Sequence, residues 1–246
     1  MSEQRLLVGK VKSAIRYPVK SMAGESLDLV KLGWHGLQDD RRYAIVKKEG
    51  LSGFPWVTAR DWPEIILYEP SISQADAQAQ PVILVRTPSG IKLPINSPEL
   101  IEEIAKRSGF PCLVLHHFGG VFDCSDVSII TTTTLKGLSE KVGTTLDLRR
   151  FRANIVIETP DDKPFPEDKW VGDLLIFGES GDLARVRVHR KDQRCMVVNL
   201  DPETAKQDPK VLKEIVSGRK NLAGIYGAAE RPGLIGVGDP VWLQKN

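Results

Sequence analysis

The chain has 246 residues, of which 41% are hydrophobic and 27% charged, and its formal net charge is +2. These values are ordinary for a soluble globular protein and give no global reason to expect binding to nucleic acid or to a membrane surface. No apolar run approaches the roughly 18 residues of a membrane span, and the first residues lack the hydrophobic segment of a signal peptide.

The cysteines are Cys112, Cys124 and Cys195, and no pair of them has C-x-x-C spacing. An odd number without that spacing excludes a disulfide framework and a zinc or iron–sulfur site built from cysteine alone. The four histidines also lack metal-ligand spacing. Three unpaired thiols suit a reducing compartment, so we expect a cytoplasmic protein. We interpret Cys112 and Cys124 as structural or incidental.

Short segments that are rich in β-branched residues or alternate in polarity predict strands in the first part of the chain. These strands are residues 6–17, 27–32, 42–46, 82–86 and 91–93. The last two flank the turn sequence Thr87-Pro88-Ser89-Gly90, which predicts a hairpin. Residues 70–81, with Ser, Gln, Ala and Asp, predict a surface loop.

Three helices are predicted from their end signals. The first begins with Ser97 as N-cap and Pro98 at the first helical position, and it ends at Gly109. The second covers residues 133–142, and the third covers residues 209–218.

The second half of the chain is otherwise strand-rich. The predicted strands are residues 154–158, 174–177, 184–190, 196–199 and 234–243. Many short strands with few short helices predict a mainly β protein, α+β by content, whose sheets close into a barrel.

Cys195 follows a basic segment that alternates with the period of a half-buried strand. The residues expected to face the core are Ala184, Val186 and Val188, and those expected on the other face are Arg185, Arg187 and His189. Arg190, Lys191 and Arg194 add positive charge just before the thiol. Such surroundings lower a thiol's pKa, favour the thiolate that binds metals, and attract an anion. The alternatives are a buried cysteine that only fills space and a solvated strand edge.

Several segments, in this order along the chain, resemble a known family. Tyr17–Ser21, Asp40–Tyr43, Ile45-Val46, and Thr58–Arg60 with Pro63 resemble the β domain found ahead of MOSC domains. Ile129–Thr131, Phe151–Ile157, Arg194-Cys195 with Asp201–Thr204, and Gly236–Asp239 resemble the MOSC domain itself. The resemblance implies an N-terminal MOSC-associated β domain in residues 1–95. Residues 96–246 would form a MOSC-type β-barrel.

The resemblance extends to the amidoxime-reducing components and their bacterial relatives. It implies a molybdenum cofactor, Mo-molybdopterin, bound through one cysteine thiolate, and an oxidoreductase that reduces N-hydroxylated compounds such as amidoximes and hydroxylamines. Cys195 would be the catalytic residue and the metal ligand. The cofactor-binding residues would be Lys20, Ser21, Arg41, Thr131, Thr134, Arg152, Asn154 and Arg194.

These residue types suit a molybdopterin, which carries a phosphate and a ring edge rich in hydrogen-bonding groups. Residues 131–134 precede a predicted helix, whose free N–H groups favour an anion, although β-propensity and helix capping also explain them. Arg152 and Asn154 alternate along a strand, so we expect them on one face. Lys20-Ser21 and Asp40-Arg41 are alternatively ordinary surface turns or ion pairs.

The chain ends soon after the MOSC motifs, so we expect neither a C-terminal ferredoxin domain nor a membrane anchor. Electrons would then come from a separate donor protein of ferredoxin, flavin or cytochrome type, and the substrate would be a small molecule. The alternative function is a carrier that holds the cofactor, or a persulfide on Cys195, without turnover. A nucleic-acid partner is disfavoured because the net charge is near zero and no aromatics interleave with the basic strand.

Overall fold

The computed structural model describes residues 5–49, 54–73 and 82–246. The strands are β1 (Arg5–Arg16), β2 (Glu25–Leu27), β3 (Leu29–Gly33), β4 (Gly36–Leu37), β5 (Tyr43–Lys47), β6 (Glu69–Ser73), β7 (Val82–Arg86), β8 (Lys92–Pro94), β9 (Cys112–His116), β10 (Val127–Thr131), β11 (Ile155–Glu158), β12 (Leu174–Phe177), β13 (Ala184–Gln193), β14 (Leu222–Arg231), β15 (Gly233–Gly236) and β16 (Pro240–Gln244). The α-helices are α1 (Pro98–Ser108), α2 (Thr132–Val142) and α3 (Pro209–Arg219). The 3-10 helices are η1 (Pro63–Leu67), η2 (Leu148–Phe151), η3 (Pro166–Lys169) and η4 (Met196–Asn199). None of these helices is long and apolar enough to cross a membrane.

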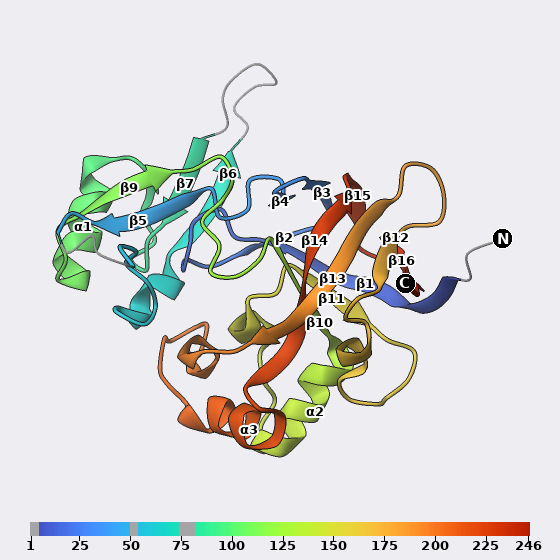
Figure 1. Ribbon diagram of the computed structural model, residues 1–246. Coiled ribbons are helices and arrows are strands. Elements are labelled where there is room, and N and C mark those ends of the chain that lie inside the picture. Colours follow the sequence, from blue (N-terminus) through green and yellow to red (C-terminus); the bar gives the residue numbers. More distant parts are fainter. Residues whose placement is uncertain (1–4, 50–53, 74–81) are drawn as a thin grey trace.

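The centre of the molecule is a closed β-barrel (Figure 1). Its strands follow the order β11-β10-β14-β13-β12-β16-β1, and β1 closes the ring by pairing antiparallel with β11. Closure removes the free sheet edges that would otherwise pair with other chains. The predicted mainly β fold with a barrel is confirmed.

Alternating side chains fill the barrel. In β13, Ala184, Val186 and Val188 are fully buried, whereas the intervening Arg185 and Arg187 are partly exposed, as the period-2 pattern predicts. Aliphatic side chains from all seven strands meet in this interior. Each contributes roughly 1.5–3 kcal/mol through burial.

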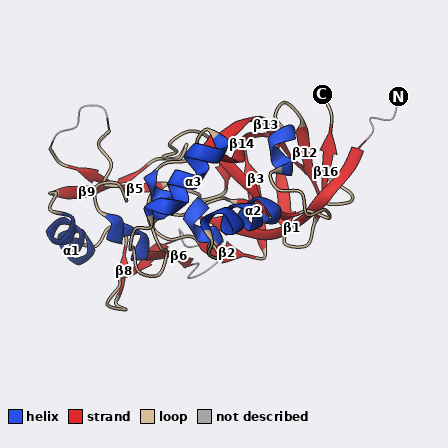
Figure 2. Cartoon of the chain, turned by 90° about the horizontal axis from the view of Figure 1, so that it is seen from below, coloured by secondary structure: helices blue, strands red, loops and turns tan. Residues whose placement is uncertain are grey.

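Helices α2 and α3 pack against the outside of the barrel (Figure 2). Ile130 of β10 and Val156 of β11 face this layer, where they meet Leu138 of α2 and Ile215 of α3. Thr131 caps α2 by accepting a hydrogen bond from the Thr134 N–H.

A second unit lies beside the barrel, on the left of Figure 1. It contains the β5–β9 pair, the β6-β7-β8 sheet and helix α1, whose N-cap is Ser97 as predicted. Its core includes Ile45, Tyr68 and Leu100, and it also takes in Leu200 from the chain after η4. The barrel half of the sequence therefore contributes to the core of the N-terminal unit.

Several local predictions differ from the structure. Strands β9 and β10 lie outside the predicted strand ranges. Residues 196–199 form the 3-10 helix η4 instead of a strand. The ten-residue strand β14 was not predicted. Of the predicted loop at residues 70–81, residues 70–73 belong to β6, and residues 74–81 lie outside the described part of the chain.

Candidate functional site

A pocket of about 160 Å³ lies where the N-terminal unit meets the barrel, and we call it the thiol pocket. Six of the nine predicted site residues line it: Lys20, Ser21, Arg41, Arg152, Arg194 and Cys195. They come from segments up to 175 positions apart, from Lys20 to Cys195. The fold thus gathers most of the predicted set into one cavity.

Cys195 lies at the N-terminus of η4, and its thiol is free and half-buried. The residues after it anchor this position on both sides. Met196 and Val197 pack on the core of the N-terminal unit, and Val198 belongs to the core of α2 and α3. The thiol is therefore held where two hydrophobic cores meet.

Lys20 and Ser21 lie in the tight loop after β1, where Ser21 has a positive φ of 69°. Only 5% of Lys20 is exposed. Its Nζ donates to Asp123 Oδ1 at 2.5 Å and to the Val121 carbonyl at 3.1 Å. Burial lowers the pKa of Lys20, and Asp123 opposes that effect.

Arg41 is fixed by neighbours on several sides. Its guanidinium pairs with the fully buried carboxylate of Asp40 and donates to the Arg152 carbonyl at 3.2 Å. It also lies 3.3 Å from Asn154 Oδ1, which accepts a further bond from the Ser128 N–H. Asn154 is itself fully buried and is not among the lining residues. The structure therefore places it behind Arg41, as a residue that orients the guanidinium.

The prediction that Arg152 and Asn154 alternate along a strand is wrong. Arg152 is the C-cap of η2, with φ of 51°, and it precedes β11. Its guanidinium lies 4.5 Å from the Tyr17 ring centroid, and that of Arg41 lies 4.7 Å from the same ring. Among the described residues, no group hydrogen-bonds Arg152 Nη2. Burial lowers the pKa of Arg152 to about 10.

Of the eight residues other than glycine that have positive φ in the described chain, three line this pocket. Ser21, Arg41 and Arg152 all have positive φ, at 69°, 51° and 51°, although none is glycine. Such conformations cost roughly 1–3 kcal/mol each and persist where the surrounding structure enforces them. Three of them around one cavity indicate a functional constraint on these side chains.

The basic strand before Cys195 contributes less charge than predicted. Arg187 pairs with Glu230 on the outside of the barrel, and Lys191 pairs with Asp168. Of the basic residues in segment 184–194, Arg194 alone lines the thiol pocket. It donates to the carbonyls of Ala223 at 2.7 Å and Phe151 at 2.6 Å.

Thr131 and Thr134 are fully buried and do not line the thiol pocket. The N-terminus of α2 instead receives an internal anion. Glu167, also fully buried, accepts from the Thr131 hydroxyl at 2.8 Å and from the Thr131 N–H at 3.4 Å. Burial raises the pKa of Glu167. The structure therefore does not bring these threonines together with Cys195, and their cofactor role stays a prediction.

The thiol pocket is strongly basic. Within the described chain, its basic lining residues are Lys20, Arg41, Arg60, Arg150, Arg152 and Arg194, and its acidic ones are Asp123 and Asp192. Three side-chain atoms of these residues are buried and have neither a hydrogen-bond nor an ion-pair partner in the described structure: Arg150 Nε, Arg152 Nη2 and Asp192 Oδ1. Buried polar atoms normally have partners. Their concentration here fits a polar, anionic ligand such as a pterin phosphate.

Sequence reasoning missed Arg60, Arg150 and Asp192 in this pocket, and it treated Cys124, which also lines it, as incidental. Arg60 stood within the motif at residues 58–60, which was a usable signal. Asp192 stood within the charged run before Cys195, where nothing distinguished it from a solvated residue.

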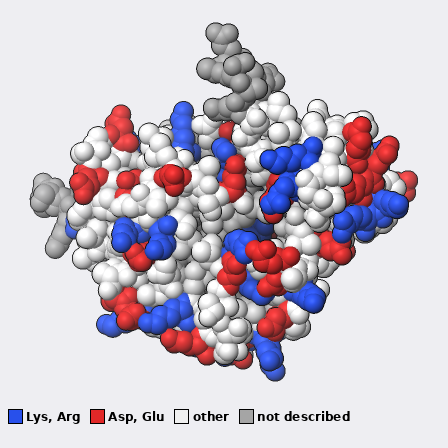
Figure 3. Space-filling model, turned by 180° about the vertical axis from the view of Figure 1, so that it is seen from behind, with Lys and Arg blue, Asp and Glu red and all other residues white. Residues whose placement is uncertain are grey.

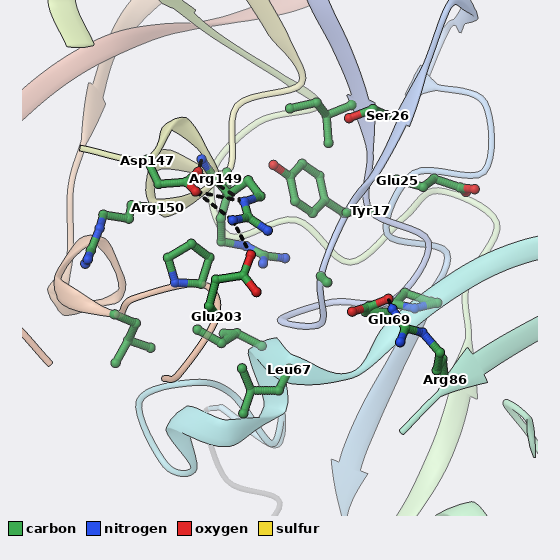
Figure 4. Close-up of a pocket in the computed structure, with 18 of the residues that line it drawn as sticks. Tyr17, Glu25, Ser26, Leu67, Glu69, Arg86, Asp147, Arg149, Arg150 and Glu203 are labelled. Atoms are coloured by element: carbon green, nitrogen blue, oxygen red, sulfur yellow. Dashed lines mark hydrogen bonds and ion pairs between the residues drawn. The ribbon is translucent and has the colours of Figure 1, made fainter. Parts of the chain in front are cut away.

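A larger groove of about 940 Å³ adjoins the thiol pocket (Figure 4). One wall holds Arg149 between Asp147 and Glu203, and the facing wall holds the ion pair of Glu69 and Arg86. Both cavities are lined by Arg150, Arg152 and Val197. The thiol pocket alone is smaller than the roughly 300–1,000 Å³ of typical ligand sites. A ligand that outgrows it would extend past these three residues into the groove.

Outside these cavities, charge is evenly mixed on the face shown in Figure 3. Lys and Arg side chains alternate there with Asp and Glu, without a continuous basic area. The concentration of cations is thus a property of the thiol pocket and not of this surface.

Comparison with known proteins identifies the family of this chain. The family model "MOSC domain" matches residues 115–242, and the model "MOSC N-terminal beta barrel domain" matches residues 8–128. The two matches overlap, and the boundary we expect after residue 95 stays a prediction.

Relatives are similar over almost the whole chain. The chain is 25% identical to mitochondrial amidoxime reducing component 2 of Bos taurus, over 96% of this chain and 83% of the relative. It is 26% identical to mitochondrial amidoxime-reducing component 1 of Homo sapiens, over 98% and 85%. The crystal structure of the YuaD protein from Bacillus subtilis has a similar fold, with TM-score 0.54 and 13% identity over 99% of this chain and 98% of that one. Since the first model alone spans more than half of the residues, the chain belongs to the MOSC domain family.

Proposed function

We propose that this protein is a molybdenum-cofactor-dependent reductase of N-hydroxylated compounds, with amidoximes and hydroxylamines as the substrate class. The observation that carries the proposal is the thiol pocket, where a free thiol adjoins six basic side chains and several unpartnered polar atoms of the described structure. The distant similarity to amidoxime-reducing components supports the same reaction. We also propose a cytoplasmic location and a separate electron-donor protein.

The residues present fit the cofactor. The Cys195 thiolate would be the protein's ligand to molybdenum, since soft sulfur suits a metal already bound by the cofactor's sulfur atoms. Lys20, Arg41 and Arg152 would neutralise the phosphate, and Ser21 would add a hydroxyl donor. When bound, the cofactor supplies the redox centre through which two electrons reach the N–O bond, which is cleaved with uptake of two protons and release of water.

The chain's own part is to bind, orient and shield. Tyr17 and Asn154 keep the two arginines in place from behind, so that little reorganisation is needed when the ligand enters. The cores on either side of η4 fix the thiol and keep bulk water from its far side.

The test is to purify the protein from cells that make the cofactor and to measure molybdenum and pterin. We expect about one of each per chain in the wild type and little molybdenum in Cys195→Ser, because the serine hydroxyl is a poor ligand for this metal. Cys112→Ser is the matched control, since Cys112 is buried in the N-terminal core away from the thiol pocket.

Activity is measured with an artificial electron donor and an amidoxime. Amidine formation that disappears in Cys195→Ser supports the reductase. Stoichiometric cofactor without turnover favours the carrier function instead. Wild-type protein without molybdenum and pterin rejects both.

A further inference from the structure

Asp192 is an acidic residue in a cation-rich pocket, and it lies three positions before Cys195. Strand β13 is irregular here, with register shifts between Val188 and Arg190 and between Lys191 and Gln193. These bulges change the side-chain alternation that holds earlier in the strand. Asp192 lies an even number of positions after the buried Val188, so the original alternation is restored there; it is only 1% exposed and forms part of the pocket wall.

One carboxylate oxygen of Asp192 is fully engaged. Oδ2 accepts from the Ser128 hydroxyl at 3.0 Å and lies 2.9 Å from Arg194 Nη2. The other oxygen, Oδ1, is buried and accepts no hydrogen bond from any residue that the structure describes. Burial raises the pKa of Asp192, and the Arg194 charge together with the Ser128 and Tyr226 hydroxyls opposes that rise. An unpaired buried oxygen of this kind costs about 1–3 kcal/mol.

A ligand of the thiol pocket is the natural partner for Oδ1. Among the described lining residues the basic ones only donate hydrogen bonds, and the other acid, Asp123, is already paired with Lys20 and Arg60. A ligand that carries N–H donors therefore finds its free carboxylate acceptor at Asp192. A pterin ring carries several such donors beside its acceptor atoms.

We infer that Asp192 Oδ1 accepts a hydrogen bond from a ring N–H of the bound pterin and so fixes the cofactor's orientation beside Cys195. This inference rests on the proposed function. Because the arginines recognise the phosphate and not the ring, an acceptor for the ring adds selection for a nitrogen heterocycle over other phosphates.

The decisive variant is Asp192→Asn, which keeps the shape and inverts the polarity at one atom. Arg194 can only donate, so the new amide keeps its oxygen toward Arg194 and Ser128. The amide nitrogen of the asparagine then takes the place of Oδ1, so its N–H donor faces the N–H donor of the pterin ring. We expect the pterin retained through gel filtration to fall about tenfold, as the loss of a hydrogen bond to a charged group implies.

Asp192→Ser separates this role from simple support of Arg194. Both variants remove the charge, but a serine hydroxyl, or water beside it, can still accept. We therefore expect serine to retain more pterin than asparagine. A purely structural role predicts the reverse order, because asparagine is the closer match in shape.

Asp168→Asn is the matched control. Asp168 shows the same pattern, with Oδ2 bound by Arg219 and Lys191 and a buried Oδ1 that nothing in the described chain satisfies, but it lines neither cavity. We expect its pterin content to equal that of the wild type.

Three results overturn the inference. Loaded wild type with equally loaded Asp192→Asn rejects it while leaving the proposed function intact. Asparagine above serine also rejects it. Wild type without pterin rejects the proposed function and this inference with it. If circular dichroism shows that Asp192→Asn does not fold, the serine variant decides, and pterin content equal to that of the wild type is then the contrary result.

Discussion

The conformation and surroundings of Arg152 are unfavourable for the stability of the protein without its cofactor. Its φ of 51° is strained, its Nη2 has no partner within the described chain, and burial lowers its pKa to about 10. A lowered arginine pKa means that the charged form is less stable in the folded chain than in water. The stacking on Tyr17 offsets only part of this cost. Stability has been traded for a positive charge in the pocket.

The variant Arg152→Met tests whether the buried charge of Arg152 lowers the stability of the folded protein. Methionine retains an unbranched apolar stem with no charge to desolvate, so we expect the cofactor-free variant to unfold at a higher temperature than cofactor-free wild type. A gain of about 1 kcal/mol corresponds to roughly 2–4 °C for a chain of this size. Pterin content of the loaded protein should fall. Differential scanning calorimetry of both forms checks the first expectation, and a lower midpoint for the variant contradicts it.

Single residues differ in how far the sequence revealed them. Asn154 was predicted to bind the cofactor, which stays a prediction. Its side chain accepts from the Ser128 N–H and donates to the Ile15 carbonyl. The strain at Ser21, Arg41 and Arg152 left no trace in composition, because positive φ at a residue other than glycine is enforced by the surrounding fold.

At the scale of elements, helix ends were predictable, whereas the short apolar run at residues 196–199 was not. Residues 196–199 are apolar over too few positions for period 2 to be told from a helical turn, and their packing between two cores decides for η4. Strand β14 was missed because glycine interrupts its pattern. A Cβ at Gly224 would lie 2.7 Å from the Ile129 carbonyl oxygen and 2.9 Å from Arg194 Nη2, so the neighbouring groups require glycine there.

The stability of the folded protein depends on pH through Glu167, which lies at the N-terminus of α2. Burial raises the pKa of this carboxyl, so the folded chain holds a proton there above the pH at which the unfolded chain releases it. The stability from this group is fully present below the usual glutamate pKa and is lost as pH rises through the raised value. In Glu167→Gln, which cannot titrate, that loss disappears.

We therefore expect the unfolding temperature of the wild type to fall relative to Glu167→Gln as pH rises above the usual glutamate pKa. Thermal unfolding followed by circular dichroism at several pH values measures the difference. A difference that stays constant with pH, or grows in the opposite direction, shows that Glu167 ionises normally in the folded protein.

At the scale of the whole molecule, the segment around η4 connects the core of the N-terminal unit with the core under α2 and α3. The barrel could be predicted from the many short strands, but the contribution of Leu200 to the N-terminal core could not, because it depends on tertiary packing between distant segments. The groove between the units also depends on tertiary packing between distant segments. Its lining residues come from both halves of the chain and have no local pattern in common.

If the proposed reductase takes its substrate through this groove, bulk placed there should hinder binding without affecting the cofactor. Ser26 lines the groove from β2 and does not line the thiol pocket. For Ser26→Trp we expect KM for an amidoxime to rise about tenfold with unchanged molybdenum content, because the indole occupies substrate space. Ser217→Trp, on the exposed side of α3, is the control. Equal KM values in both variants exclude this route.

Strand β1 lies between β11 and β16, so the first strand of the chain pairs with the last. During synthesis on the ribosome, β1 emerges early but cannot complete its hydrogen bonds until residues 240–244 have left the exit tunnel. Barrel closure therefore waits for the segment that contains β16. A cofactor that binds the closed barrel would therefore enter only after β16 has paired with β1.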